Sequence, residues 1–192
     1  MLLMLAGGVL LAGLGVLIWV EHAQSLKAWP MAPVRLAAFE KSGVRVTVTL
    51  QPARNNEGLL TATFTPLQDG YHMYSKDLPR TGVNGVGRPT LLELTSGSRM
   101  LALGKLQESV QASESVDTEV PGLRVYPAGP VTLSLLVALP TSDLKWIDDQ
   151  VSITYMACSE RGCLQPVIGK LLSVKVPAIP PMVVTPFFNP SQ

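Results

Sequence analysis

The chain contains two cysteines, Cys158 and Cys163, in the stretch YMACSERGC near the end of a strand-like run. Two thiols at this spacing can form a structural disulfide, contribute to a metal site, or exchange electrons as a dithiol–disulfide couple. A zinc site needs four ligands, usually two cysteine pairs or cysteines with paired histidines. The two histidines, His22 and His72, are distant from the cysteines in sequence. We therefore expect no metal and no other cofactor.

A bridge between these cysteines would close a loop of only six residues. In the chain-entropy model so short a loop stabilises the fold by about 2 kcal/mol, the low end for disulfides. Immunoglobulin-type domains often carry a disulfide, but theirs joins two sheets through residues far apart in sequence. Strained or exposed bridges are the ones that exchange readily. The spacing alone leaves both a redox-active pair and a structural pair open.

Other sequence patterns give weaker indications of a functional site. The stretch GVNGVG (residues 82–87) lacks the Lys-Ser/Thr ending of a phosphate loop and precedes Pro89 and a strand, so we interpret it as an ordinary loop. A hydrolase triad would have to use His72, and no nucleophile elbow accompanies it. Asp148 and Asp149 are expected in a solvated turn before a strand. A net charge of +1, from 15 basic and 14 acidic residues, provides no basic stripe for nucleic acid.

The elements that must position the cysteines are short strands. Alternation of apolar and polar residues, typical of half-buried strands, marks Val44–Leu50, Leu59–Thr65, Thr90–Thr95, Val131–Leu139, Val151–Ala157 and Lys170–Val176. Turn residues such as Asp69-Gly70 and Asn84-Gly85 separate them. The pattern predicts an all-β fold, an immunoglobulin-like antiparallel β-sandwich, with a closed barrel as the alternative.

The first 21 residues predict a membrane segment. Residues 2–20 form a run of nineteen without a charge, long enough for a transmembrane helix and longer than the core of a cleaved signal peptide. Glu21 stands where a cleavage site needs a small residue, so we favour one uncleaved N-terminal transmembrane helix in residues 1–21. We expect a tether in residues 22–40, the β-sandwich domain in 41–178 and a proline-rich tail in 179–192.

The residues around the cysteines match a known family. The stretch VSITYMACSERGCLQPV (residues 151–167) resembles the closing strand and cysteine hairpin of the N-terminal periplasmic domain of DsbD, the thiol:disulfide interchange protein. Upstream, DGYHMYSKD (residues 69–77) and GVGRPTLLEL (residues 85–94) resemble the family's Gly-Tyr/Trp-His-x-Tyr-Ser segment and its Gly-Arg-Pro-Thr strand. The resemblance covers about residues 40–178.

The resemblance implies a fold, a location and an activity. The fold is immunoglobulin-like, and the domain faces the periplasm on a single-pass inner-membrane helix, or is secreted there if that segment is cleaved. The activity is thiol–disulfide interchange, as a component of a protein-disulfide reductase system. Cys158 and Cys163 would relay reducing equivalents from a multi-span membrane thiol transporter to thioredoxin-like or cytochrome c maturation proteins. Cys163 would form the mixed disulfides and Cys158 would resolve them.

The resemblance also implies which side chains line the cysteine pair. The family's aromatic residues beside the site correspond to His72 and Tyr74, with Tyr71 one place earlier. Its cap loop corresponds to residues 117–126, which carry Val120 or Leu123 in place of an aromatic residue.

Within that loop, Glu119 is a candidate acidic neighbour that would raise a thiol pKa by like-charge repulsion. Pro166 lies one residue further from Cys163 than the corresponding proline does in the family. The sequence given ends at Gln192, so we expect the electron donor to be a separate polypeptide. The alternative function is a non-catalytic immunoglobulin-like binding or assembly module with a structural hairpin disulfide.

Overall fold

The computed structural model describes residues 32–53, 55–115 and 120–181. Within these ranges the regular structure consists of β-strands, and every strand pair is antiparallel. The all-β antiparallel fold is thus confirmed. The predicted N-terminal helix, residues 22–31 of the tether and residues 182–192 of the tail lie outside the described residues. Among those that are described, no helix is long and apolar enough to cross a membrane.

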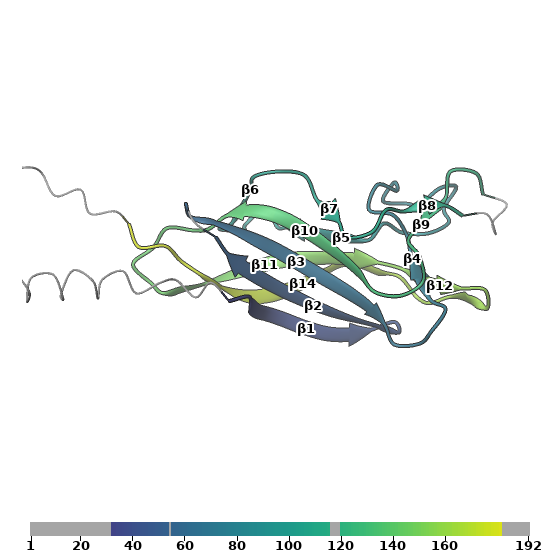
Figure 1. Ribbon diagram of the computed structural model, residues 1–192, viewed down its shortest axis with the longest axis horizontal. Helices are drawn as coiled ribbons and strands as arrows, with labels where there is room; N and C mark the ends of the chain where they lie inside the picture. Colours follow the sequence, from purple (N-terminus) through teal and green to yellow (C-terminus); the bar gives the residue numbers. More distant parts are fainter. Residues whose placement is uncertain (1–31, 54, 116–119, 182–192) are drawn as a thin grey trace, which may run out of the picture. The chain divides into compact units, whose positions relative to one another are not determined.

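The larger sheet has the strand order β1-β2-β3-β10-β6, with β7 also pairing with β10 (Figure 1). Its members are β1 (Val34–Lys41), β2 (Val44–Pro52), β3 (Glu57–Pro66), β6 (Leu101–Ala102), β7 (Gln107–Glu108) and β10 (Val131–Ala138). Strand β2 alternates buried and more exposed residues along its whole length. This period of two sends one set of side chains into the core and leaves the other nearer to water.

The second sheet has the order β14-β11-β5 and supplies the other half of the core. Its strands are β5 (Leu91–Leu94), β11 (Trp146–Tyr155) and β14 (Val167–Pro177). Val151, Ile153 and Tyr155 of β11 are fully buried. The ring of Tyr155 meets Phe64 of β3 edge-on, with 5.6 Å between centroids, which is a favourable arrangement for two aromatic rings.

Two smaller sheets adjoin this core. One has the order β13-β12-β4 and consists of β4 (His72–Met73), β12 (Ala157–Ser159) and β13 (Gly162–Cys163). The other pairs β8 (Ser113–Glu114) with β9 (Arg124–Val125). Strand β12 follows β11 after a single residue, so the cysteine hairpin extends the long strand β11 beyond the core (Figure 1).

The long strands of both sheets run between the same two ends of the domain. At one end, here called the terminal end, Val34 pairs with Leu50 and Trp146 pairs with Pro177. At the other, the cysteine end, Tyr155 pairs with Val167 and donates its hydroxyl proton to the carbonyl of Lys41, 2.7 Å away. The described chain therefore begins and ends at the terminal end, opposite the cysteines.

The six predicted strands are all present, but strand β1 was not predicted. Residues 34–40, expected in the tether, pair with β2 along the edge of the larger sheet. Ser42 and Gly43, both at positive φ (46° and 66°), make the two-residue turn that joins β1 to β2. Pro33 precedes the first paired residue, where no ladder N–H is required.

The pair Asp148–Asp149 also differs from the prediction, because both residues lie inside β11 rather than in a turn. Asp149 is 8% exposed, and its Oδ2 accepts hydrogen bonds from Ser98 Oγ and from the N–H groups of Arg99 and Met100, at 3.0–3.1 Å. The carboxylate thereby ties the segment before β6 to the second sheet.

Replacing Asp149 should destabilise the domain far more than replacing its neighbour. Asp149→Ala removes the carboxylate that accepts hydrogen bonds from three backbone N–H groups and one hydroxyl, which we expect to lower the free energy of unfolding by about 3 kcal/mol. Asp148→Ala removes only an exposed ion pair with Lys175 and should cost about 0.5 kcal/mol or less. Chemical denaturation of both variants measures the difference, and equal costs would contradict the bracing role of Asp149.

Candidate functional site

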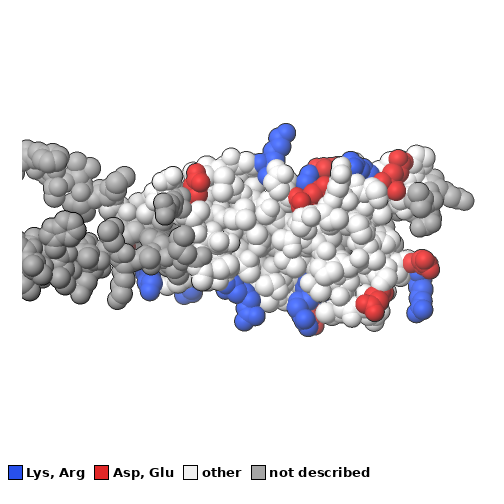
Figure 2. All heavy atoms as spheres, viewed as in Figure 1, with Lys and Arg blue, Asp and Glu red and all other residues white. Residues whose placement is uncertain are grey.

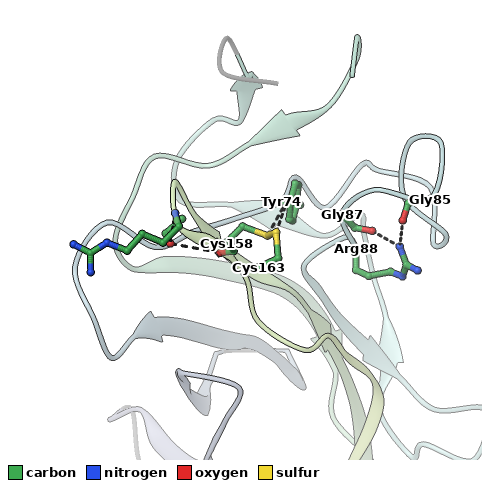
Figure 3. The surroundings of a disulfide bond; sticks show 9 residues. Tyr74, Gly85, Gly87, Arg88, Cys158 and Cys163 are labelled. Atoms are coloured by element: carbon green, nitrogen blue, oxygen red, sulfur yellow. Dashed lines mark hydrogen bonds between the residues drawn. A yellow bond between two sulfur atoms is a disulfide. The ribbon is translucent and has the colours of Figure 1, made fainter. Parts of the chain in front are cut away.

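The two cysteines face each other across a tight hairpin. Cys158 of β12 is the register partner of Cys163 of β13, and Glu160 and Arg161 form the connecting loop. The N–H of Leu164 donates to the carbonyl of Ala157 at 2.9 Å, so the cysteines occupy the adjacent non-hydrogen-bonded position, where facing residues approach most closely. Their Cα atoms lie 4.0 Å apart and the sulfurs form a disulfide (Figure 3).

The hairpin is held in place by contacts that do not involve the disulfide. On its other edge β12 pairs with β4, with Ala157 opposite Met73 and Cys158 opposite His72. Leu164 packs over Gly43 in the β1–β2 turn so closely that a Cβ there would lie 2.5 Å from Leu164 Cδ1. These contacts can keep the hairpin folded whether the sulfurs are bonded or reduced.

The two sulfur-bearing residues differ sharply in exposure. Cys158 is 2% exposed and belongs to an apolar cluster with Tyr74, Leu78 and Leu123, whereas Cys163 is exposed. Thiol–disulfide exchange requires a thiolate to reach the sulfur that it attacks. An incoming protein can therefore reach Cys163, while Cys158 can be reached only from within the hairpin.

Tyr74 supplies a polar group beside the sulfurs. Its hydroxyl donates a hydrogen bond to Cys158 Sγ at 3.0 Å and lies 3.7 Å from Cys163 Sγ (Figure 3). The ring is 3% exposed, and burial raises the pKa of Tyr74. The hydroxyl therefore remains protonated, and able to donate, throughout the neutral range.

The loop of residues 82–87 forms the support behind this ring. A Cβ on Gly87 would lie 2.9 Å from two ring carbons of Tyr74, so only a glycine lets the loop backbone lie so close to the ring. Val83 and Val86 exchange two backbone hydrogen bonds around Asn84 and Gly85, which both have positive φ, as a tight hairpin turn requires. The loop is thus a rigid backing for Tyr74.

Arg88 and Thr90 complete the attachment of that loop. The guanidinium group of Arg88 donates to the carbonyl of Thr81 at 2.8 Å. It also donates to the carbonyl of Gly85 at 2.9 Å (Figure 3). The hydroxyl of Thr90, fully buried, donates to the carbonyl of Tyr74 at 2.7 Å. Residues 88–90 therefore join the loop backbone to Tyr74, which directly follows β4.

The other residues expected from the sequence take different positions. His72 lies in β4 opposite Cys158, and its ring meets Tyr74 edge-on at 5.8 Å. Val120 is half-buried against the apolar cluster around Cys158. The carbonyl of Tyr71 accepts the N–H of Gly129 at 3.1 Å, which ties its backbone to the loop before β10. Glu119 lies outside the described residues.

Several residues that position the site were not expected from the sequence. Gly87 ends the stretch of residues 82–87 that we interpreted as an ordinary loop, and the Asn-Gly turn signal of that stretch did not reveal which ring the loop would contact. Arg88 lies in the Gly-Arg-Pro-Thr segment of the family resemblance, which implied no role for its side chain. Tyr126 is fully buried; its hydroxyl donates to Glu108 and accepts the N–H of Lys76, which follows β4 closely. Burial and the hydrogen bond to Glu108 both raise the pKa of Tyr126.

The arrangement is suited to exchange at one accessible sulfur backed by one buried sulfur. A short hairpin keeps the second thiol within reach of the first, as resolution of a mixed disulfide requires. In the described ranges, no group of three or more His, Cys, Asp or Glu side chains is placed to hold a metal ion.

Among known proteins, the chain has a likeness to solved structures and none to a sequence family. No protein-family model and no curated protein matches the chain. Solved structures similar to it include the N-terminal domain of DsbD from Neisseria meningitidis in the reduced form, with 18% sequence identity. The match covers 81% of this chain and 93% of that one, with a TM-score of 0.39, which is too low to establish a common fold.

Removing the Tyr74 hydroxyl should slow the step carried out by Cys158. A hydrogen bond to sulfur favours the thiolate, so Tyr74→Phe should lower the thiolate fraction of Cys158. We expect resolution of a mixed disulfide on Cys163 to slow about threefold at neutral pH and the difference to vanish at alkaline pH, where the thiolate forms fully. Release of the second nitrothiobenzoate from a dithiobis-nitrobenzoate reaction follows this step.

Tyr155→Phe is the matched control for that measurement. Its hydroxyl is also buried, with a pKa raised to about 12 by burial, but it donates to the Lys41 carbonyl instead of a sulfur. The rate of resolution should stay at the wild-type value in this variant. If resolution slows equally in both variants, the cause is a general loosening of the domain, and the hydrogen bond from Tyr74 to sulfur has no specific effect.

Gly87→Ala should disturb the site more than Gly85→Ala does. Both glycines have similar positive φ angles, 76° and 83°, so the backbone cost of alanine is shared. A Cβ at Gly85 meets nothing within 4 Å, whereas at Gly87 it displaces the Tyr74 ring. We expect Gly87→Ala to cost about 1–3 kcal/mol more in the free energy of unfolding. Denaturation of the two variants tests this, and indistinguishable values would refute the close contact.

Proposed function

We propose that this chain is a thiol–disulfide interchange domain whose Cys158–Cys163 pair cycles between dithiol and disulfide. The observation that carries the proposal is the difference in solvent exposure between two cysteines that face each other directly. Cys163 is exposed at the tip of the domain, and Cys158 is 2% exposed beneath the Tyr74 hydroxyl. This is the arrangement that sequential attack and resolution require.

The exchange runs in two balanced steps. In the reduced domain the Cys163 thiolate attacks a disulfide of the partner, forming a mixed disulfide and releasing the first partner thiolate. Cys158 loses its proton and attacks the Cys163 sulfur, which closes the intramolecular bridge and releases the second partner thiolate. The partner gains two electrons and two protons, and a donor dithiol restores the pair by the reverse sequence.

The contacts of the hairpin fit a bond that opens and closes. The bridge closes a six-residue loop and contributes only about 2 kcal/mol by chain entropy. The pairing of β12 with β4 and the contact between Leu164 and Gly43 do not depend on it. The domain can thus stay folded in both redox states, as a shuttle must.

The partners follow from the resemblance to the DsbD N-terminal domain. The two resembling segments, residues 69–77 and 151–167, come together where Cys158 pairs with His72, as two parts of one site should. On this basis the domain is an immunoglobulin-like sandwich that exchanges with thioredoxin-like proteins. We extend the proposal to a multi-span membrane thiol transporter as donor, cytochrome c maturation proteins among the acceptors, and a periplasmic domain anchored by residues 1–21 in the inner membrane.

Trapping of mixed disulfides tests the assignment of the two cysteines. In Cys158→Ala the exposed Cys163 can attack but nothing resolves the product, so a mixed disulfide with an oxidised thioredoxin-like protein should accumulate. Cys163→Ala is the matched control; it should yield far less adduct because Cys158 is buried. Non-reducing electrophoresis with mass spectrometry detects the adducts. Equal adduct from both variants would contradict the roles assigned to the two sulfurs.

The same experiment distinguishes the alternative function. A binding or assembly module with a structural bridge should form no adduct in either variant. Its reduction potential would also lie below about −300 mV, where the glutathione pool does not reduce it. A potential above that value, together with adduct in Cys158→Ala alone, would support the interchange function.

A further inference from the structure

Exposed apolar side chains gather at the terminal end of the domain, far from the cysteines. Of the ten large hydrophobic residues that are markedly exposed among the described ones, six lie there: Leu59, Leu101, Leu103, Leu136, Leu144 and Trp146. The strand registers place the four leucines of the larger sheet together, since Leu136 faces Leu59 and the next outward residue of β10, Ala138, faces Leu101. The N–H of Leu103 donates to the carbonyl of Leu136 at 2.9 Å.

The most exposed of them stands on a braced loop between β10 and β11. Leu144 is 67% exposed and Trp146 is 38% exposed, with Lys145 between them. The N–H of Ala178 donates to the carbonyl of Lys145 at 3.1 Å, and the N–H of Leu144 donates to Ser142 Oγ at 3.1 Å. The backbone is therefore held, and the apolar side chains point outward from a fixed support.

Leucine, lysine and tryptophan side by side suit the boundary between lipid and water. Leucine enters the acyl region, the amphipathic indole settles at the headgroup level, and lysine keeps its ammonium group beside the phosphates. Charged residues at this end have a small positive excess, with Arg35, Arg99, Lys145 and Lys175 against Asp143 and Asp148 and the half-buried Glu57, and a few cations attract a zwitterionic bilayer only weakly. Figure 2 shows both signs dispersed over a mainly uncharged surface of the domain. The apolar residues must therefore dominate any attraction to a bilayer.

The covalent chain limits how far this end can be from a membrane. Residues 2–20 carry no charge, and residues 21–31 separate them from Ala32, where the described chain begins. Eleven residues extend over at most about 40 Å. Ala32 lies two residues before Val34, whose partner Leu50 is at the terminal end. If residues 2–20 span a bilayer, the leucine-rich end is within reach of its surface.

We propose that the terminal end of the domain rests on a phospholipid bilayer, with Leu144 and Trp146 inserted at the interface. Strand β11 runs from Trp146 to Tyr155, nine steps of about 3.3 Å, and the cysteine hairpin lies beyond it. With β11 upright on the membrane, the exposed Cys163 stands about 30 Å or more from the lipid. A reductant or acceptor must project that far from the membrane or be soluble.

Quenching by brominated lipid tests this orientation in the full chain. Trp19→Phe/Trp29→Phe leaves Trp146 as the single tryptophan of the three in the sequence. The protein is reconstituted into phosphatidylcholine vesicles with and without bromine on the acyl chains near the headgroup. We expect loss of Trp146 emission with brominated lipid, and recovery of most of it in Leu144→Ser. The quenching should persist in high salt, because charge does not dominate the contact.

The opposite end of the domain supplies matched controls. Ile168 is 64% exposed, close to the value for Leu144, but lies at the start of β14 near the cysteines. Ile168→Ser should leave Trp146 quenching unchanged. A tryptophan introduced there by Ile168→Trp in a Trp19→Phe/Trp29→Phe/Trp146→Phe background should not be quenched.

The proposal is overturned if Trp146 keeps its emission in brominated vesicles, whether or not a Trp19-only variant is quenched. It is also overturned if Trp146 becomes quenched only after removal of residues 182–192, because those residues would then be what covers the leucines. Adduct formation by Cys158→Ala in solution does not depend on this surface. Failure of the membrane contact and failure of the interchange function are therefore distinguishable.

Discussion

The cysteine site depends on the position of strand β12 between two neighbouring strands, β4 and β13. On one side β12 pairs with β4, which brings the segment carrying His72 and Tyr74 to the cysteines across more than eighty residues of chain. On the other side it pairs with β13, which sets Cys158 against Cys163. A shift of one residue in either register would turn the sulfur of Cys158 to the opposite face. The disulfide, the Tyr74 contact and the burial of Cys158 all follow from this one arrangement.

The sandwich has the role of a rigid mount for that strand. Tyr155 ends β11 with its ring packed on Phe64 and its hydroxyl bonded to the Lys41 carbonyl, so β12 leaves the core at a defined point. The loop of residues 82–87 presses on the other face of the site, through the contact of Gly87 with Tyr74. Because both supports are dense and independent of the sulfurs, opening the disulfide need not loosen the fold.

The different exposure of the two cysteines suits the chemistry of thiol–disulfide exchange. An exposed sulfur alone would form adducts without release, and a buried sulfur alone would not react with proteins. Exposing Cys163 and burying Cys158 separates attack from resolution, while a protonated tyrosine hydroxyl stands where a thiolate would form. Placing the pair at the end opposite both described termini also leaves it open to large partners.

Local patterns in the sequence were enough to predict the antiparallel all-β fold, the six long or central strands and the pairing candidates Cys158 and Cys163. Alternation of apolar residues and turn composition are local patterns that span only a few residues. They predict strands reliably because each strand buries one of its faces in the folded domain. Strand β1 was not predicted because, as an edge strand, it has little alternation of apolar and polar residues. The burial of Asp149 was not predicted because it depends on N–H groups that come from a distant part of the chain. The support of Tyr74 by Gly87 and the unequal exposure of the two sulfurs were decided by tertiary structure, although the family resemblance had already implied different roles for Cys163 and Cys158. Both arise from packing between segments far apart in the chain, which spacing within one segment does not encode.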